Sequence, residues 1–160
     1  MKISQKQFGK ENSITLMAKQ NFARLVRYEG DLDRAESLMR DVLASRTKLL
    51  GAKHIDTLET ANSLARVLRY QSKQSEAVNI LRDTVKFRGS VLGPRHHDTI
   101  SSMNNLAGCL SEMKGKSLEA EKMFKDVIRI LIQTLGETHR VTINACGNLG
   151  VVYLKRDDAS

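Results

Sequence analysis

The sequence contains no tryptophan, and aromatic residues of all kinds make up only 4% of it. Proline occurs once, at Pro94. A β-sandwich or β-barrel normally needs more aromatic and β-branched residues and more turn signals, so the composition argues against an all-β fold. Apolar residues at 41% and charged residues at 28% are instead typical of a folded, soluble chain. We therefore expect the 160 residues to form an all-helical protein.

Long apolar runs and paired cysteines are also missing. The richest apolar stretch, residues 127–132, is interrupted by Arg129 and is much shorter than a membrane span. The first residues hold no apolar core of a secretory signal. The two cysteines, Cys109 and Cys146, have no zinc-ligand spacing and suit a reducing compartment. These features predict a cytoplasmic protein that does not bind a membrane.

Acidic residues are fewer than basic residues. Lysine and arginine together number 26 against 18 aspartates and glutamates, which gives a net charge of +8. A chain of this charge attracts acidic partners, whether a peptide, a nucleic acid or a membrane surface. The total charge does not choose among these, so the positions of the basic residues in the fold have to decide.

A short pattern recurs along the chain. A Leu-Gly pair is followed by a histidine and, three residues later, by a threonine, and successive histidines lie 42 and 43 residues apart. The copies are Leu50-Gly51 with His54 and Thr57, Leu92-Gly93 with His96 and Thr99, and Leu135-Gly136 with His139 and Thr142. Other columns, such as Asn62-Ser63-Leu64-Ala65 and Asn104-Asn105-Leu106-Ala107, keep the same register. This periodicity predicts a stack of repeated units.

Each unit is predicted to hold two helices, because apolar residues recur with helical spacing in both of its halves. An aspartate or threonine after each histidine, Asp56 or Thr57 in one unit, is placed to cap the first helix. The glycine of each Leu-Gly pair would provide a left-handed cap for the second. We expect first helices near 14–28, 56–70, 98–113 and 141–156, and second helices near 32–50, 74–92 and 117–135. The units span about 8–50, 51–92 and 93–135, with a half unit at 136–156, in a single domain of residues 1–160.

The repeated residues resemble tetratricopeptide repeats of the 42-residue kind found in kinesin light chains. The shared pattern is roughly N-x-L-A, then G, E-A-E and L, and finally L-G-x-x-H-x-x-T, and it covers nearly the whole chain. In the family a proline usually follows the histidine, whereas this chain has Ile55, His97 and Arg140 there. The resemblance implies a right-handed α-solenoid of stacked antiparallel helix pairs, a superhelix of about 3.5 repeats. Because the last helix has no partner, we expect a segment of a longer array or an edge that stacks on another copy.

A polar stripe adjoins the apolar stripe on the first helices. Seven of its residues are candidates for binding a peptide: Gln20, Arg24, Arg27, Asn62, Arg66, Arg69 and Asn104. The resemblance implies that this stripe lines a concave groove and that asparagines at the Asn62 and Asn104 positions clamp a peptide backbone. Independently, an amide offers both a donor and an acceptor, and guanidinium groups suit carboxylates. Tyr28 and Tyr70 would add stacking surface, and Gly108 and Gly147 would leave space for a bulky side chain. The alternative is that the arginines are solvated or pair with acidic residues of adjacent helices.

No catalytic, cofactor or metal site is predicted. The repeating histidines lie in units roughly 10 Å apart, so they cannot share one ion with bonds of about 2 Å, and we interpret them as residues that order a loop. Cys109 and Cys146 lack the partners of a nucleophile and are expected to be small buried residues. The segment Gly115-Lys116-Ser117 has the wrong spacing from Gly108 for a phosphate-binding loop and falls in a turn.

The remaining basic residues, for example Arg46, alternate with acidic residues on the second helices. Such alternation is typical of a solvated face. A continuous basic stripe with stacking aromatics, which would favour nucleic acid, is not evident.

The sequence thus favours a non-catalytic scaffold that binds an extended acidic peptide of a partner in its concave groove, and the resemblance to kinesin light chains suggests that it recognises a cargo or an adaptor. A second hypothesis is assembly. The helix at 141–156 exposes Val151, Val152, Tyr153 and Leu154, so it could support self-association or form part of a larger signalling protein such as a repeat-tailed NTPase.

Overall fold

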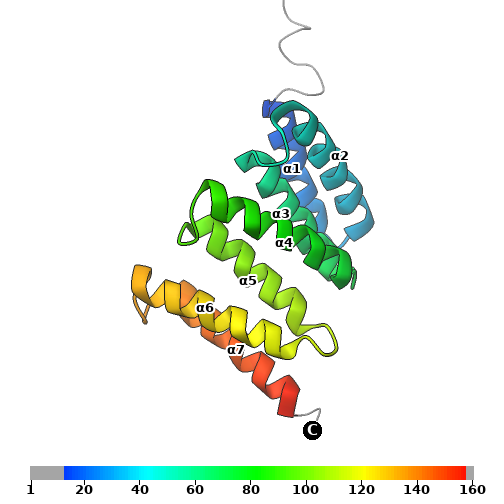
Figure 1. Ribbon diagram of the computed structural model, residues 1–160. Helices are drawn as coiled ribbons and strands as arrows, with labels where there is room; N and C mark the ends of the chain where they lie inside the picture. Colours follow the sequence, from blue (N-terminus) through cyan, green and yellow to red (C-terminus); the bar gives the residue numbers. More distant parts are fainter. Residues whose placement is uncertain (1–12, 158–160) are drawn as a thin grey trace, which may run out of the picture. The chain divides into compact units, whose positions relative to one another are not determined.

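The computed structural model describes residues 13–157, and within this range the chain forms helices and no strand (Figure 1). The helices are α1 (Ser13–Tyr28), α2 (Leu32–Leu50), α3 (Ile55–Tyr70), α4 (Gln74–Val91), α5 (His97–Ser111), α6 (Ser117–Leu135) and α7 (Arg140–Asp157). The all-α prediction is confirmed, and the expected helix limits agree with these to within two residues. The start of the first predicted unit, residues 8–12, lies outside the described residues.

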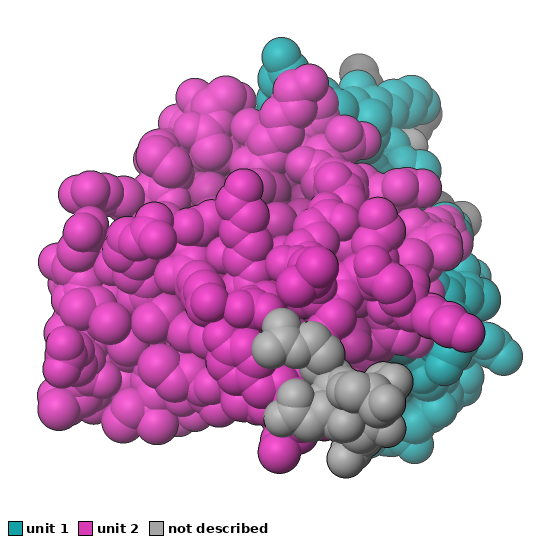
Figure 2. All heavy atoms as spheres, turned by 60° about the horizontal axis from the view of Figure 1, so that its bottom comes forward, with its two compact units in different colours: residues 1–73 teal, residues 74–160 magenta. Residues whose placement is uncertain are grey.

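The chain divides into two compact units, residues 1–73 and 74–160 (Figure 2). In the first unit α2 packs against both α1 and α3, and α1 also contacts α3. In the second unit α4 contacts α5, α5 contacts α6, α6 contacts α7, and α5 also contacts α7. Within each unit, every helix therefore packs on its neighbours in sequence, as expected for stacked helix pairs. The single domain and the repeat limits stay predictions.

Small residues recur where helices meet. Alanines in corresponding columns of the first and second helices are fully buried: Ala23, Ala65, Ala107, Ala35, Ala77 and Ala120. A methyl side chain lets two backbones approach closely, while the larger Met39, Leu81 and Phe124 fill the adjacent column of the second helices. The sequence repeat is thus a repeat of the core. None of the helices in the described part of the chain is both long enough and apolar enough to span a bilayer.

Histidines cap three of the first helices, α3, α5 and α7, which corrects our prediction that Asp56, Thr57 and their counterparts do so. The ring nitrogen Nδ1 of His54 accepts a hydrogen bond of 3.2 Å from the backbone N–H of Asp56. His96 accepts in the same way from Asp98 at 3.2 Å, and His139 from Val141 at 3.3 Å. Each bond satisfies an N–H group that has no partner inside its helix. The histidines therefore act at the starts of these helices, as caps.

Glycine ends α2 and α6, but in a different conformation from the one predicted. Gly51 and Gly136 have φ of +89° and +91°, a region that favours glycine. Their ψ angles of 159° and 163° place them in a positive-φ region that is almost restricted to glycine and lies outside the left-handed helical region. The need for glycine is therefore confirmed, while the predicted cap geometry is wrong.

A buried arginine links a second helix to the next first helix, once in each unit. In the first unit Arg46 donates to the Asp56 carbonyl and the Thr60 hydroxyl, both at 2.8 Å. In the second unit Arg88 donates to the Asp98 carbonyl and the Ser102 hydroxyl, both at 2.9 Å. We call this arrangement the arginine latch. Our placement of Arg46 on a solvated face was wrong. The residue is buried, because its guanidinium donates hydrogen bonds to oxygen atoms of the protein in place of water.

The cysteines occupy different environments. Cys109 is buried in α5, as predicted, whereas Cys146 is exposed on α7. The two residues occupy different positions of the repeat, so the burial of Cys109 does not imply the burial of Cys146.

Candidate functional site

Six of the seven predicted site residues lie on two helices of the first unit that contact each other. Gln20, Arg24 and Arg27 project from α1, and Asn62, Arg66 and Arg69 from α3. Asn104 lies on α5 in the second unit. Each unit therefore carries its own set of candidate residues.

Arg27 is flanked by two aromatic rings at the C-terminal ends of α1 and α3. Its guanidinium carbon lies 4.2 Å from the centroid of the Tyr28 ring and 5.3 Å from that of Tyr70. Both distances are within the range of cation–π attraction. Tyr28 is 73% exposed and Tyr70 is 59% exposed, so one face of this arrangement is open to a partner. We call Arg27, Arg66, Tyr28 and Tyr70 the Arg-Tyr cluster.

Arg66 adds a second positive charge to the Arg-Tyr cluster. A hydrogen bond with Arg27, the positive charge of Arg27 and then that of Arg66 lower the pKa of the Tyr28 phenol below its ordinary value of 10. A positive neighbour favours the ionised phenolate, so the direction of the shift follows from two guanidinium groups beside one ring. Arg66 itself is exposed on α3.

A shallow hollow adjoins the Arg-Tyr cluster at the turn between α1 and α2. Its volume is about 380 Å³. The residues that line it are Arg27, Tyr28, Gly30, Leu32 and Tyr70. The hollow therefore combines one guanidinium group with aromatic and aliphatic walls, which suits a segment that carries both a carboxylate and an apolar side chain.

Arg24 pairs with an acidic residue of an adjacent helix, which is the alternative that we left open for the arginines. It forms an ion pair with Glu59 of α3 and donates a hydrogen bond of 3.3 Å to the Ser63 hydroxyl. Because this pair joins α1 to α3, Arg24 has a role inside the unit. Arg69 is half-buried on α3.

The predicted position of Gln20 on an exposed stripe is wrong. Its side-chain oxygen accepts hydrogen bonds from Arg46 and from the Thr60 hydroxyl, and the residue is only 4% exposed. Asn62 is likewise buried, at 5% exposure. Periodicity placed these residues beside the apolar stripe of their own helix, but the neighbouring helices determine how much of them solvent reaches.

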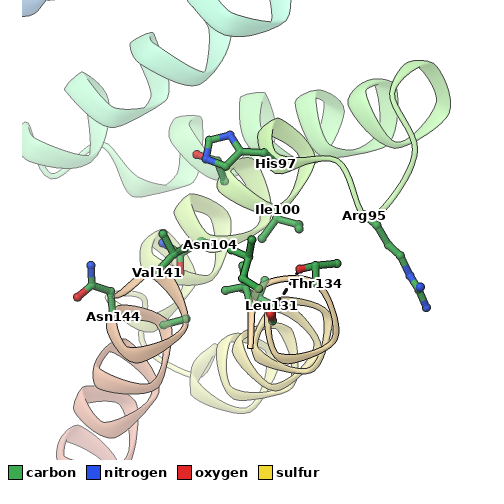
Figure 3. A pocket seen from close by; sticks show the side chains of 12 residues that line it. Arg95, His97, Ile100, Asn104, Leu131, Thr134, Val141 and Asn144 are labelled. Atoms are coloured by element: carbon green, nitrogen blue, oxygen red, sulfur yellow. Dashed lines mark hydrogen bonds between the residues drawn. The ribbon is translucent and has the colours of Figure 1, made fainter. Parts of the chain in front are cut away.

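In the second unit, Asn104 is half-buried, and its side-chain oxygen accepts a hydrogen bond of 3.4 Å from Asn148 of α7. Of the two glycines at which we expected space, Gly147 is exposed, with no atom within 4 Å of the position that a Cβ would take, whereas Gly108 is buried. A cavity of about 280 Å³ lies beside Ser101, Asn104 and Asn144 (Figure 3). Sequence reasoning missed this cavity.

Acidic, histidine and cysteine side chains do not gather anywhere along the described chain into a group of three or more that could hold a metal ion.

Comparisons with known proteins agree with the repeat architecture. Two family models described as tetratricopeptide repeat match the chain, one over residues 13–90 and the other over residues 99–140. No curated protein matches it.

Solved structures of similar fold come from repeat proteins. Two crystal structures of nearly identical TPR-like repeats from a putative kinesin light chain of Podosopora anserina, one of them a Q17M variant, are each 24% identical. The TM-score is 0.81 for the variant and 0.78 for the other, and each alignment covers 96% of this chain and 72% of that one. BtubC (BKLC) from P. vanneervenii is 22% identical with a TM-score of 0.75, over 89% of this chain and 56% of that one. At such identities the likeness shows the fold, an all-α solenoid.

Proposed function

The chain belongs to the tetratricopeptide repeat family, and on that premise we propose that its first unit binds an extended acidic segment of a partner protein at the Arg-Tyr cluster. A tetratricopeptide scaffold is suited to protein–protein interaction, and the fold is typically non-catalytic. The neighbours named as putative kinesin light chains favour an adaptor role, with the partner as a cargo or adaptor protein.

The observation that carries the proposal is that the Arg27 guanidinium lies within cation–π distance of two exposed tyrosine rings. Ring contacts hold the guanidinium near one orientation, so less side-chain entropy is lost when a carboxylate binds. The rings also offer apolar surface on which aliphatic or aromatic side chains of the segment can pack. Arg66 provides a second positive charge, and the attraction should weaken as the salt concentration rises.

Of the seven residues predicted from the sequence, Arg27 and Arg66 have the geometry that best suits such a partner. Arg24 is engaged with Glu59, and Gln20 is buried by its bonds to Arg46 and Thr60. The proposal therefore assigns the carboxylate contacts to Arg27 and Arg66, with Tyr28 and Tyr70 as the apolar platform.

Fluorescence anisotropy tests the proposal with a pool of labelled peptides rich in Asp and Glu that each carry one aromatic residue. The wild type is compared with Arg27→Gln/Arg66→Gln and with a control of equal charge change, Lys122→Gln/Arg129→Gln, whose two sites are exposed on α6. We expect binding to weaken by about tenfold or more in the first variant alone. Equal weakening in both variants, or no binding by the wild type, would overturn the proposal. Circular dichroism confirms that all three proteins are folded.

Self-association through α7 stays a second candidate, and one observation favours it. Ile143, Val151 and Leu154 are exposed and lie on one side of α7. Our expectation was wrong for Val152, which is buried on the opposite side, and Tyr153 is half-buried. Sedimentation equilibrium of the wild type and Leu154→Glu separates the two functions. A dimer that the substitution disrupts would support assembly, whereas a monomer that still binds acidic peptides would support the Arg-Tyr cluster alone.

A further inference from the structure

Helix α1 buries one side and exposes an apolar stripe on the other. Its buried residues are Leu16, Gln20, Ala23 and Val26. Opposite them run five exposed residues, which we call the α1 stripe: Ile14, Met17, Asn21, Leu25 and Tyr28. At 3.6 residues per turn, the five fall within about a quarter of the helix circumference. Four of them are large apolar or aromatic residues with exposed fractions between 53% and 73%, whereas such side chains are usually scattered singly over a surface.

The α1 stripe carries no charge, although charged residues make up 28% of the chain. Two of the basic residues of α1 form ion pairs with other helices, Lys19 with Asp41 at 2.8 Å and Arg24 with Glu59. An acidic segment would therefore find no cation on the stripe itself. A second copy of the chain carries the same net charge of +8, and an uncharged face lets two such chains meet without placing like charges against each other.

The spacing of the α1 stripe is symmetric about Asn21. Its members follow one another at intervals of three, four, four and three residues. When two copies of this helix pair in opposite directions about a two-fold axis at Asn21, Met17 of each copy meets Leu25 of the other, and Ile14 meets Tyr28. A two-fold contact requires a self-complementary surface of this kind. The antiparallel direction also places the positive end of each helix dipole beside the negative end of the other.

Asn21 would lie on the two-fold axis of such a pair. Its amide offers both a donor and an acceptor, so two copies of the same amide can exchange a pair of hydrogen bonds. A single asparagine in an apolar helix seam fixes the register, because other registers leave the amide against apolar side chains without a partner. Asn21 therefore selects the register in which the symmetric spacing of the stripe is satisfied.

We infer that the α1 stripe is a dimer interface, and that its occupant is the α1 stripe of a second copy in an antiparallel pair centred on Asn21. Two helices of this length are expected to bury less than the roughly 1,200 Å² of a standard interface, so the dimer should be weak and depend on concentration. The inference does not depend on the proposed function, because Arg27 and Arg66 are not part of the stripe. Tyr28 is shared with the Arg-Tyr cluster, so a chain in the dimer cannot offer that ring to an acidic segment.

Sedimentation equilibrium over a wide range of protein concentration tests the inference. Leu25→Glu places a charge on the stripe, and Leu154→Glu is its matched control on α7, because the two leucines are 60% and 67% exposed. The wild type and Leu154→Glu should dimerise with the same dissociation constant, whereas Leu25→Glu should raise it by about tenfold or more. A wild type that stays monomeric throughout would overturn the inference, as would a dimer that Leu154→Glu dissociates and Leu25→Glu does not.

Disulfide cross-linking tests the register, in a Cys146→Ser background because Cys146 is exposed. Chains with Met17→Cys and chains with Leu25→Cys, tagged to differ in mass, are oxidised alone and as a mixture with oxidised glutathione. The mixed dimer should form several-fold faster than either like pair, and Thr15→Cys, an exposed position of α1 outside the stripe, should cross-link no faster than the like pairs. Met17→Cys that links to itself as fast as to Leu25→Cys would overturn the antiparallel register.

The Arg27→Gln/Arg66→Gln variant separates this inference from the proposed function. It should dimerise as the wild type does, while losing affinity for acidic peptides. Loss of the dimer in this variant would move the interface to the Arg-Tyr cluster and overturn the inference. A dimer that Leu25→Glu disrupts, in a protein that binds no acidic peptide, would support the α1 stripe and remove the proposed function alone.

Discussion

The guanidinium carbon of Arg27 lies 4.2 Å from the centroid of the Tyr28 ring, although the two residues are neighbours in the sequence. Adjacent residues on a helix point in directions about 100° apart, so this contact requires the arginine to fold back over the ring. The result is a positive charge held against an exposed aromatic surface, on which the proposed function depends.

The pKa of Tyr28 reports this contact. Arg27→Gln is expected to raise the pKa of the phenol toward its ordinary value of 10, because the hydrogen bond and charge of Arg27 lower it in the wild type. Tyrosinate absorbance against pH, with Tyr28→Phe subtracted in each background, measures the shift. Lys19→Gln, on the same helix, is the control and should leave the titration unchanged. A Tyr28 titration that is identical with and without Arg27 would show that the contact does not persist in solution.

Glu36 should make the first unit sensitive to acid. Its carboxylate lies 2.6 Å from the Lys73 ammonium and 2.7 Å from the Arg40 guanidinium. The hydrogen bond with Lys73 is the largest cause that lowers the pKa of Glu36, from 4.5 to about 2. The carboxylate therefore stabilises the folded state above pH 4.5, and this contribution is lost as the pH falls from there through about 2.

Urea denaturation of Glu36→Gln tests this linkage. We expect the free energy of unfolding to fall by about 1 kcal/mol near neutral pH, since the pair is partly exposed, and the difference from wild type to vanish in strong acid. Glu29→Gln, an exposed position of the same unit, should change little. A Glu36→Gln deficit that is the same at neutral and strongly acidic pH would contradict the assigned direction.

The histidine caps should be measurable one at a time. His96→Ala is expected to lower the free energy of unfolding by about 1 kcal/mol, because it leaves the backbone N–H of Asp98 without its acceptor. His96→Asn keeps a side-chain acceptor and should lose less. His97→Ala removes the adjacent ring and is the control. The capping role fails if His96→Ala and His97→Ala have equal effects.

The arginine latch should be replaceable only as a pair. Arg88→Leu alone is expected to cost about 1–3 kcal/mol, because it leaves the buried hydroxyl of Ser102 without a donor, while the Asp98 carbonyl keeps only the hydrogen bond from Ser102 as a side-chain donor. Adding Ser102→Ala, which copies Leu131 and Ala145 of the third repeat, should recover part of that loss. A double-mutant cycle by thermal or urea unfolding measures the coupling. Strictly additive costs would mean that the two residues do not act together.

The repeat pattern was sufficient to predict the helices. Apolar periodicity and the Leu-Gly pairs mark where each helix runs and ends, so the largest error is at α5, predicted as 98–113 and found as His97–Ser111. Both signals are local in the sequence, which is why they could be read without knowledge of the packing.

The burial of polar residues could not be predicted in the same way. Arg46 alternates with acidic residues and so resembled a solvated position, but its partners, Gln20 and Thr60, come from helices on either side of it in the sequence. The alignment of the repeats did contain a signal for this burial. An arginine and a hydroxyl residue recur together at matching positions of two repeats, as Arg46 with Thr60 and as Arg88 with Ser102. In the third repeat the arginine is replaced by Leu131, which lines the cavity of the second unit.

The most direct test of the central claim is a titration of the isotope-labelled chain with an acidic peptide, followed by amide chemical shifts. The account predicts that the largest perturbations fall at the C-terminal ends of α1 and α3, around Arg27, Tyr28, Arg66 and Tyr70, and that they shrink with rising salt. Perturbations confined to other helices, or spread evenly over the basic surface, would contradict it.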